Sequence, residues 1–142
     1  MGYKNPIEEL TTEWYDLING VSGILSVYKE TVSSLEEDNY VIIRAEGQNT
    51  TKNHSGFFSN VVIIVEIVTK FNVSVDTSIV NTIDNIITEL VFPTPNTFGI
   101  PDLTNHQIID ISLESSNYVS EDDGSNKYYT KISRYNHSLN QK

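Results

Sequence analysis

The sequence has 142 residues, with 19 acidic and 9 basic side chains and a formal net charge of -10. A chain of this length suits one domain with one hydrophobic core, and its acidic charge argues against a surface that neutralises nucleic-acid phosphates. It contains no cysteine, which excludes disulfides, thiolate metal ligands and cysteine nucleophiles.

An amphipathic helix is the first predicted element, and we expect it to end near Asn19. Asn5 suits the N-cap and Pro6 the first helical position, while Gly20 is a common residue just beyond a helix end. Apolar residues recur at helical spacing and form a single stripe. They are Ile7, Leu10, Trp14, Leu17 and Ile18.

Three strands are predicted next, over residues 24–32, 40–46 and 57–71. The third has the strongest period-two pattern, and its first face is predicted to lie in the core. This face carries Phe57, Val61, Ile63, Val65, Ile67 and Phe71. The second face carries Phe58, Val62, Ile64 and Val68, interrupted by Glu66 and Lys70. Because the second face is more apolar than a solvated sheet face, we expect another surface to cover it.

The length of the third strand and its pairing are also predicted. At about 3.3 Å per residue it would extend roughly 50 Å, so we expect it to bend or to project as a ribbon. If the apolar faces match, antiparallel pairing places Val41 opposite Ile63 and Ile43 opposite Val61. The polar residues 47–56 are then predicted to form a long, mobile hairpin loop.

A second amphipathic helix is predicted from an N-cap at Asp76 until Pro93 and Pro95 end it. The residues of this segment that recur at helical spacing form a broad apolar face, and its polar residues lie outside that face. The apolar face consists of Ile79, Val80, Ile83, Ile86, Ile87, Leu90 and Val91.

A closing hairpin is the last predicted unit. In its first strand Ile109, Ile111 and Leu113 alternate with polar residues that we expect to face water. Residues 117–126 are predicted to form an acidic turn that contains the hairpin signal Asp123-Gly124, and the final strand is predicted over 127–135. We expect one domain over residues 1–136 and a flexible tail over residues 137–142.

These elements predict an α+β fold with the order α-β-β-β-α-β-β. The expected architecture is a mostly antiparallel sheet of about four or five strands packed against two helices, with long hairpin arms. The longest apolar run, Val61–Val65, is far shorter than the roughly 18 residues that a membrane span needs. We therefore expect a soluble protein without membrane contact.

Candidate chemistry is sparse in this sequence. His106, Asp110 and Glu114 share one side of an ideal strand and offer metal-ligating atoms, but an ordinary solvated strand face explains them better. The acidic turn at residues 121–124 lacks the alternating oxygen ligands of an EF-hand loop. Gly-rich phosphate loops and nucleophile motifs are absent from the sequence. We expect no enzymatic activity, no cofactor and no metal.

The order of elements resembles that of tailed-phage tail terminator proteins and related head-tail neck proteins. The features that carry the resemblance are the first helix, the strand ending near Val27-Tyr28, the strand beginning Tyr40-Val41, the long hairpin into 61–68, the helix with its isoleucine stripe, and the Asp123-Gly124 hairpin. The resemblance covers most of the chain and rests on pattern and order.

This resemblance implies a small α+β subunit of a virion, assembled in the host cytoplasm. Such subunits commonly form a hexameric ring at the neck end of the tail, where the ring ends tail-tube growth and joins the head connector. Head-connector or portal-side proteins and tail proteins are the implied partners. The acidic charge would let DNA pass through the lumen without sticking to it. The resemblance leaves open the ring order and whether the phage is long-tailed or short-tailed.

The implied ring predicts a subunit interface made of the second face of the third strand and the tyrosines near the last hairpin. Its predicted members are Phe58, Val62, Ile64, Glu66, Val68, Tyr118, Tyr128 and Tyr135. The tyrosines suit simple cross-strand pairing equally well. One alternative is a small monomeric or dimeric ligand-binding or enzymatic domain that uses the strand face of His106, Asp110 and Glu114. Another is an adaptor of a secretion or contractile injection machine.

Overall fold

The described part of the protein contains two helices and five strands, in the predicted order α-β-β-β-α-β-β. The structure is a computed structural model and describes residues 2–24, 26–29, 39–54, 56–71, 77–122 and 124–142. The elements are α1 (Ile7–Ile18), β1 (Val27–Lys29), β2 (Asn39–Asn53), β3 (Gly56–Phe71), α2 (Thr77–Val91), β4 (His106–Asp122) and β5 (Lys127–Gln141). The predicted α+β class is confirmed.

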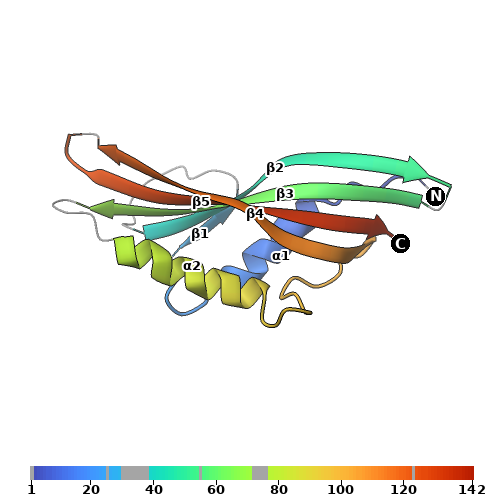
Figure 1. The fold of residues 1–142 in the computed structure, drawn as a ribbon, viewed down its shortest axis with the longest axis horizontal. Helices are drawn as coiled ribbons and strands as arrows, with labels where there is room; N and C mark the ends of the chain where they lie inside the picture. Colours follow the sequence, from blue (N-terminus) through green and yellow to red (C-terminus); the bar gives the residue numbers. More distant parts are fainter. Residues whose placement is uncertain (1, 25, 30–38, 55, 72–76, 123) are drawn as a thin grey trace.

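The five strands form one long sheet in the order β1-β2-β3-β5-β4. Only β1 pairs in parallel, with β2, and the other three pairings are antiparallel, as the sequence predicted for most of the sheet. In Figure 1 the sheet twists along its length, and both helices lie on one side of it. The two chain ends and the β2–β3 hairpin lie at one end of the sheet, and the β4–β5 hairpin lies at the other.

The hydrophobic core lies between the two helices and the sheet face they cover. The predicted α1 stripe supplies Leu10, Trp14 and Ile18, which are fully buried, while α2 supplies Val80 and Ile87. The odd-numbered residues of β3 complete the core from the sheet side. They are Val61, Ile63, Val65 and Ile67. The two helix predictions are therefore confirmed, although Asp76 lies outside the described residues. The first-face prediction for β3 is confirmed for these four residues and wrong for Phe57 and Phe71, which lie outside the core near the two ends of the strand.

Local side chains explain where α1 begins and ends. The Asn5 side-chain oxygen accepts a hydrogen bond from the Ile7 backbone N–H at 3.0 Å, which satisfies one of the unpaired donors of the first turn. The Asn19 N–H donates to the Tyr15 carbonyl at 2.8 Å, and Gly20 then adopts φ 81, a value that favours glycine.

The predicted loop over residues 47–56 is wrong, because β2 and β3 stay paired until Asn53 lies opposite Gly56. Consequently Val41 lies opposite Ile67 rather than Ile63, and Ile43 lies opposite Val65 rather than Val61. The predicted parity is right up to a bulge between Ala45 and Gly47. Backbone pairing does not require apolar side chains, so the polar residues continue the ladder instead of leaving it.

The predicted flexible tail is also wrong for residues 137–141, which are the last part of β5. They pair with β3 on one side and with β4 on the other, and both His137 and Leu139 are buried. The first strand is shorter than predicted within the described residues, because Ile24 belongs to a turn and β1 begins at Val27.

β4 extends through Asp122, so the predicted turn over residues 117–126 is wrong for residues 117–122. Two β-bulges in β4 also overturn the predicted alternation of the closing hairpin. They lie between Ile108 and Asp110 and between Leu113 and Ser115. Each bulge resets which residues face the core. Ile111 is buried as predicted, but Ile109 is 55% exposed and Leu113 is 44% exposed, and Ile108 takes the place of Ile109 in the core.

Gly99 packs so closely against the end of α2 that any larger side chain would overlap the helix backbone. Its N–H donates to the Val91 carbonyl at 2.9 Å, and an added Cβ would lie 1.9 Å from the Leu90 carbonyl oxygen. We predict that Gly99→Ala lowers the free energy of unfolding by about 1–3 kcal/mol, because the backbone must shift to relieve the overlap. Urea denaturation followed by far-UV circular dichroism measures this change.

Gly47→Ala is the matched control for Gly99→Ala. An added Cβ at Gly47 meets nothing within 4 Å, so its effect should stay within about 0.5 kcal/mol. Equal stability of the two variants would contradict the proposed close contact at Gly99.

Candidate functional site

The sheet face turned away from both helices is the most distinctive surface of the protein. We call it the open face, and it carries the even-numbered residues of β3 from Phe58 to Lys70 and of β5 from Tyr128 to Asn140. A groove of about 450 Å³ lies on this face, toward the end of the sheet that carries the β4–β5 hairpin. The groove is lined by Tyr40, Ile42, Glu66, Val68, Val119, Glu121, Tyr128, Thr130 and Ile132.

Apolar side chains make up much of the groove lining, and none of them packs in the core cluster under the helices. Ile42, Val68 and Ile132 come from three adjacent strands, and Val119, from β4, is 38% exposed. This arrangement follows from the second apolar face that the sequence shows on β3. The sheet therefore has one apolar face under its helices and a partly apolar face without a helix among the described residues.

Ion pairs cross the open face next to the groove. Arg44 pairs with Glu66 at 2.9 Å, and Arg134 pairs with Glu46 at 2.7 Å. Both arginines lie directly opposite Ile64 on the neighbouring strands, and Ile64 is only 1% exposed. The aliphatic parts of long charged side chains commonly cover apolar neighbours in this way. The open face is thus charged near its middle and more apolar at the groove.

Most predicted interface residues lie on the open face. Phe58, Val62, Ile64, Glu66, Val68 and Tyr128 are all there, because they share the even parity of β3 and β5. Their role as an interface stays a prediction. Ile42 and Ile132, on the neighbouring strands, also line the groove and were not predicted from the sequence. Ile132 belongs to the predicted final strand, but its place beside β3 depends on a pairing that the sequence does not show.

Tyr135 is a correction to the predicted interface. It lies on the helix side of the sheet with 0% exposure, 4.8 Å from the Trp14 ring centroid and 6.2 Å from the Phe92 centroid. A neighbouring subunit cannot reach this ring without disrupting the core. Burial also raises the pKa of the Tyr135 hydroxyl, so this phenol stays neutral.

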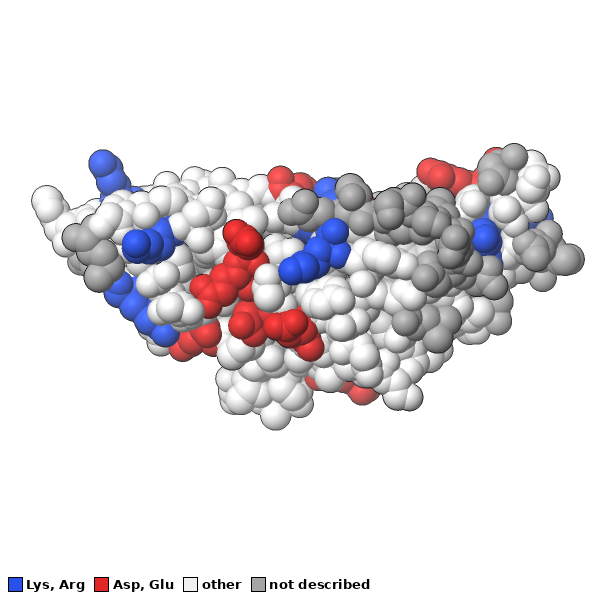
Figure 2. Space-filling model, turned by 180° about the vertical axis from the view of Figure 1, so that it is seen from behind, with Lys and Arg blue, Asp and Glu red and all other residues white. Residues whose placement is uncertain are grey.

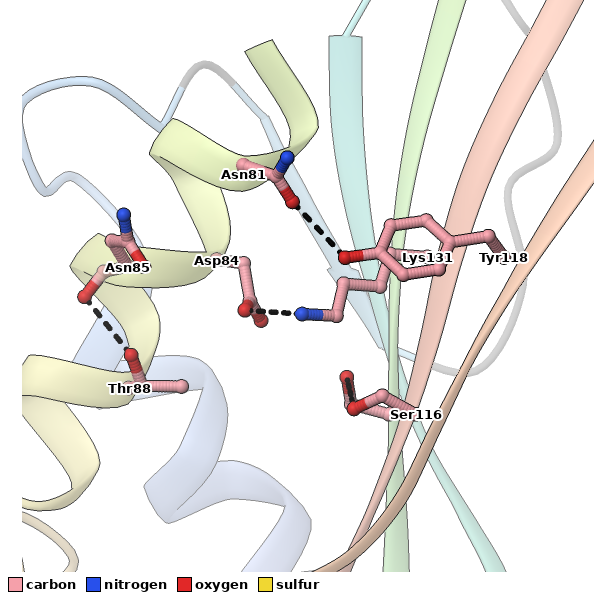
Figure 3. Close-up of polar contacts among 8 residues, drawn as sticks. Asn81, Asp84, Asn85, Thr88, Ser116, Tyr118 and Lys131 are labelled. Carbon is pink, nitrogen blue, oxygen red and sulfur yellow. Dashed lines mark hydrogen bonds and ion pairs between the residues drawn. The ribbon is translucent and has the colours of Figure 1, made fainter. Parts of the chain in front are cut away.

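Tyr118 also lies on the helix side, in a polar cluster that ties α2 to the β4–β5 hairpin (Figure 3). Its hydroxyl donates to the Asn81 side-chain oxygen at 3.0 Å, and its ring stacks on Tyr129 with centroids 5.5 Å apart. The Lys131 ammonium lies 5.3 Å from the Tyr118 ring centroid and 2.5 Å from an Asp84 carboxylate oxygen. Tyr118 is nevertheless 48% exposed, so one side of its ring remains accessible.

The Lys131–Asp84 pair is mostly shielded from water, with 11% and 13% of the two side chains exposed. Burial acts to lower the pKa of Lys131, but the hydrogen bond and negative charge of Asp84 outweigh it and raise this pKa. Removing one partner would leave the other charge partly buried and unpaired, which is costly.

We predict that Lys131→Met lowers the free energy of unfolding by about 1–3 kcal/mol, because it leaves the Asp84 carboxylate unpaired. The double variant Asp84→Asn/Lys131→Met should lose less free energy of unfolding than the sum of the losses in the two single variants. Chemical denaturation of the four proteins in a double-mutant cycle measures the coupling. Strict additivity would contradict a direct interaction between the two side chains.

The predicted metal-ligating face of His106, Asp110 and Glu114 does not form. His106 is buried at 2% exposure, whereas Asp110 and Glu114 are exposed and are separated from it by one and two bulges. The described residues contain no group of three or more histidine, aspartate or glutamate side chains suited to hold a metal ion. The alternative built on this strand face therefore loses its structural basis.

His137 is buried in the core, where sequence reasoning placed a flexible tail. Trp14 donates its indole N–H to Nε2 of His137 at 2.8 Å, so Nδ1 carries the proton and donates to the Val61 carbonyl at 3.0 Å. A second proton would fall on Nε2 and break the hydrogen bond from Trp14. Burial lowers the pKa of His137 to about 4 despite its backbone hydrogen bonds, and burial lowers the pKa of His106 too.

We predict that stability falls as the pH is lowered from about 6.5 to about 4. In this range the unfolded chain binds a proton at residue 137 while the folded protein does not, so the folded state is fully favoured only above about pH 6.5. The loss due to His137 is on the order of 3 kcal/mol. Urea titrations at several pH values measure it.

The matched variants for this pH effect are His137→Gln and His54→Gln. His137→Gln removes the titrating group and should flatten this part of the pH dependence, although it also weakens the contact with Trp14. His54 is exposed, so His54→Gln should leave the pH dependence unchanged. If the free energy of unfolding changes with pH equally steeply in the wild type and both variants, a neutral, buried His137 is contradicted.

Comparison with known proteins identifies chains of similar fold among solved structures. The chain is similar to a chain of a structure described as the virion of a native gene transfer agent particle, with a TM-score of 0.64 and 6% sequence identity. The similarity covers 95% of this chain and 99% of that chain. No family model and no curated protein matches the sequence. No helix among the described residues has the length and apolar character of a membrane span.

Proposed function

We propose that this chain is a structural virion protein of a tailed phage or phage-like particle. In this proposal it is a ring-forming neck or tail-terminator subunit that joins the head connector to the tail and lines the DNA passage. It would assemble in the host cytoplasm and contact the head connector or portal-side proteins, the tail proteins and other copies of itself. A hexamer is the expected ring order.

The observation that carries the proposal is the fold similarity to a chain of a gene transfer agent virion. The similarity extends over nearly the whole of both chains, so it concerns the complete arrangement of elements and not one common motif. It agrees with the independent resemblance in element order to tail terminator and neck proteins. At such low identity the similarity concerns the fold, and the function is our inference from it.

The open face supports an assembly role through its chemistry. A sheet face with Ile42, Val68 and Ile132 beside tyrosines matches the composition of protein interfaces better than that of a solvated surface. The flanking ion pairs of Arg44 and Arg134 provide a charged border next to it. An enzymatic role has less support, since His106, Asp110 and Glu114 are not brought together.

The net charge is consistent with a DNA passage. A ring of subunits with a formal charge of -10 each would present a strongly negative surface, which repels phosphates and allows DNA to move without being bound. The acidic side chains of α1, including Glu8 and Glu9 in its first turn, contribute to this charge.

We predict a closed ring for the purified protein, with a hexamer as the expected order. Native mass spectrometry over a concentration series gives the subunit number, and negative-stain electron microscopy shows whether the particles are closed rings. Ile132→Asp, which places a charge in the groove, should shift the protein toward monomers. A chain that stays monomeric at every concentration would contradict ring formation in solution.

Ile109→Asp is the matched control for Ile132→Asp. Ile109 is 55% exposed on β4 and does not line the groove, so the same chemical change should leave the ring intact. Loss of the ring in both variants would show that the groove has no special role. Circular dichroism of both proteins shows whether each is folded.

A further inference from the structure

We propose that the tip of the β2–β3 hairpin of one copy docks into the groove on the open face of a neighbouring copy. We call this hairpin the arm and define it as residues 47–54 and 56–60. The inference rests on the proposed function, because it names the pair of surfaces through which the subunits of the ring meet.

The arm and the groove lie at opposite ends of the sheet. On β3, Phe58 lies at the arm and Val68 lies in the groove, ten residues further along. At about 3.3 Å per residue this spacing places the two sites roughly 33 Å apart. Figure 1 shows the arm at the end with both chain termini and the β4–β5 hairpin, which borders the groove, at the other. Two different surfaces at opposite ends suit a head-to-tail contact, which closes into a ring when the rotation allows.

Lys52 on the arm and Glu121 at the groove offer one pair of opposite charges, although the chain as a whole is acidic. From Gly47 to Val65 the sequence contains one charged residue, Lys52, and no carboxylate. Lys52 is exposed near the arm tip. The end with the termini, at the left of Figure 2, shows basic side chains, and acidic ones lie nearer the middle.

The groove has two carboxylates in its lining, Glu66 and Glu121, and Asp122 follows at the end of β4, opposite Lys127. Lys70 also lies on the open face, opposite Tyr128 of the groove. Glu66 is paired with Arg44, whereas Glu121 is exposed at the outer rim. A lysine that approaches from the arm of another copy would therefore meet Glu121 first. Opposite charges at such a rim select the partner and its orientation more than they add affinity.

Apolar groups at the arm tip match the apolar lining of the groove. Phe57 and Phe58 are half-buried at the tip, and Phe58 lies on the open face opposite Thr51. Phe57 contacts the Tyr3 ring at a centroid distance of 5.6 Å, which supports the tip from the N-terminal segment. Aromatic side chains on a supported hairpin are common anchors of protein interfaces, and the groove offers Ile42 and Ile132 to receive one.

A charge exchange tests this contact. Lys52→Glu and Glu121→Lys should each weaken the association of subunits at least about tenfold, because each places like charges at the arm-groove contact. An equimolar mixture of the two variants should restore the wild-type subunit number, since every mixed contact again joins one positive and one negative residue. Native mass spectrometry and sedimentation velocity measure the species present.

Lys29→Glu and Glu114→Lys are the matched controls. They change the net charge by the same amounts at exposed positions outside the arm and the groove, so each alone should leave the assembly unchanged. If Lys52→Glu and Glu121→Lys behave like these controls, or if their mixture does not reassemble, the arm-groove contact is wrong. A wild-type protein that remains monomeric overturns it as well.

The results separate this inference from the proposed function. If the wild-type protein forms a ring that the charge exchange does not affect, the proposed ring is supported and the arm-groove contact is rejected. If the wild-type protein is a dimer that each variant disrupts and the mixture restores, the arm-groove contact is supported as a reciprocal contact between two copies. The proposed ring is then rejected.

Discussion

The continuous pairing of β3 on both sides is the constraint on which the rest of the structure depends. β3 pairs with β2 and with β5 along almost its whole length, so its backbone groups are satisfied without help from the helices. Its side chains then point to two faces, both with many apolar residues. Two helices cover one face, and the other becomes the open face with its groove. Because β2 and β3 stay paired beyond the helices, the end of their hairpin forms the arm.

Two polar contacts fix how the helices sit on this sheet. Trp14 on α1 donates to His137 on β5, and Asp84 on α2 pairs with Lys131 on the same strand. Hydrogen bonds and ion pairs have directional geometry, so each restricts the position of a helix more narrowly than apolar packing alone. β5 is therefore the strand against which both helices are positioned. Its last residues have a structural role although their sequence is polar.

The division of the sheet into a covered face and an open face suits a protein that works in an assembly. The helices stabilise the subunit from one side, and the other side keeps an apolar groove that another molecule can cover. A basic, aromatic arm at one end of the sheet and a partly acidic groove near the other give the subunit two unlike surfaces. Unlike surfaces favour head-to-tail contacts, and such contacts are the ones that build rings.

The sequence by itself determined the elements of the fold and their order. Helical periodicity identified both helices, because a stripe such as Leu10, Trp14 and Ile18 repeats with the helical turn. The alternation in β3 revealed both of its faces, and so indicated most of the open-face residues, because side-chain direction in a strand depends only on local parity. Residue chemistry and short-range spacing were sufficient for these conclusions.

Only the tertiary structure decided the register, the bulges and the contacts between distant segments. The four-residue difference in the β2–β3 pairing depends on where the chain turns, and polar residues pair as readily as apolar ones. The bulges in β4 reversed the expected positions of Ile108 and Ile109, which separated His106 from Asp110. His137 became a core residue and Tyr135 was removed from the predicted interface because β5 pairs between β3 and β4. Pairing between strands far apart in the chain depends on the whole sheet, so local sequence patterns do not contain it.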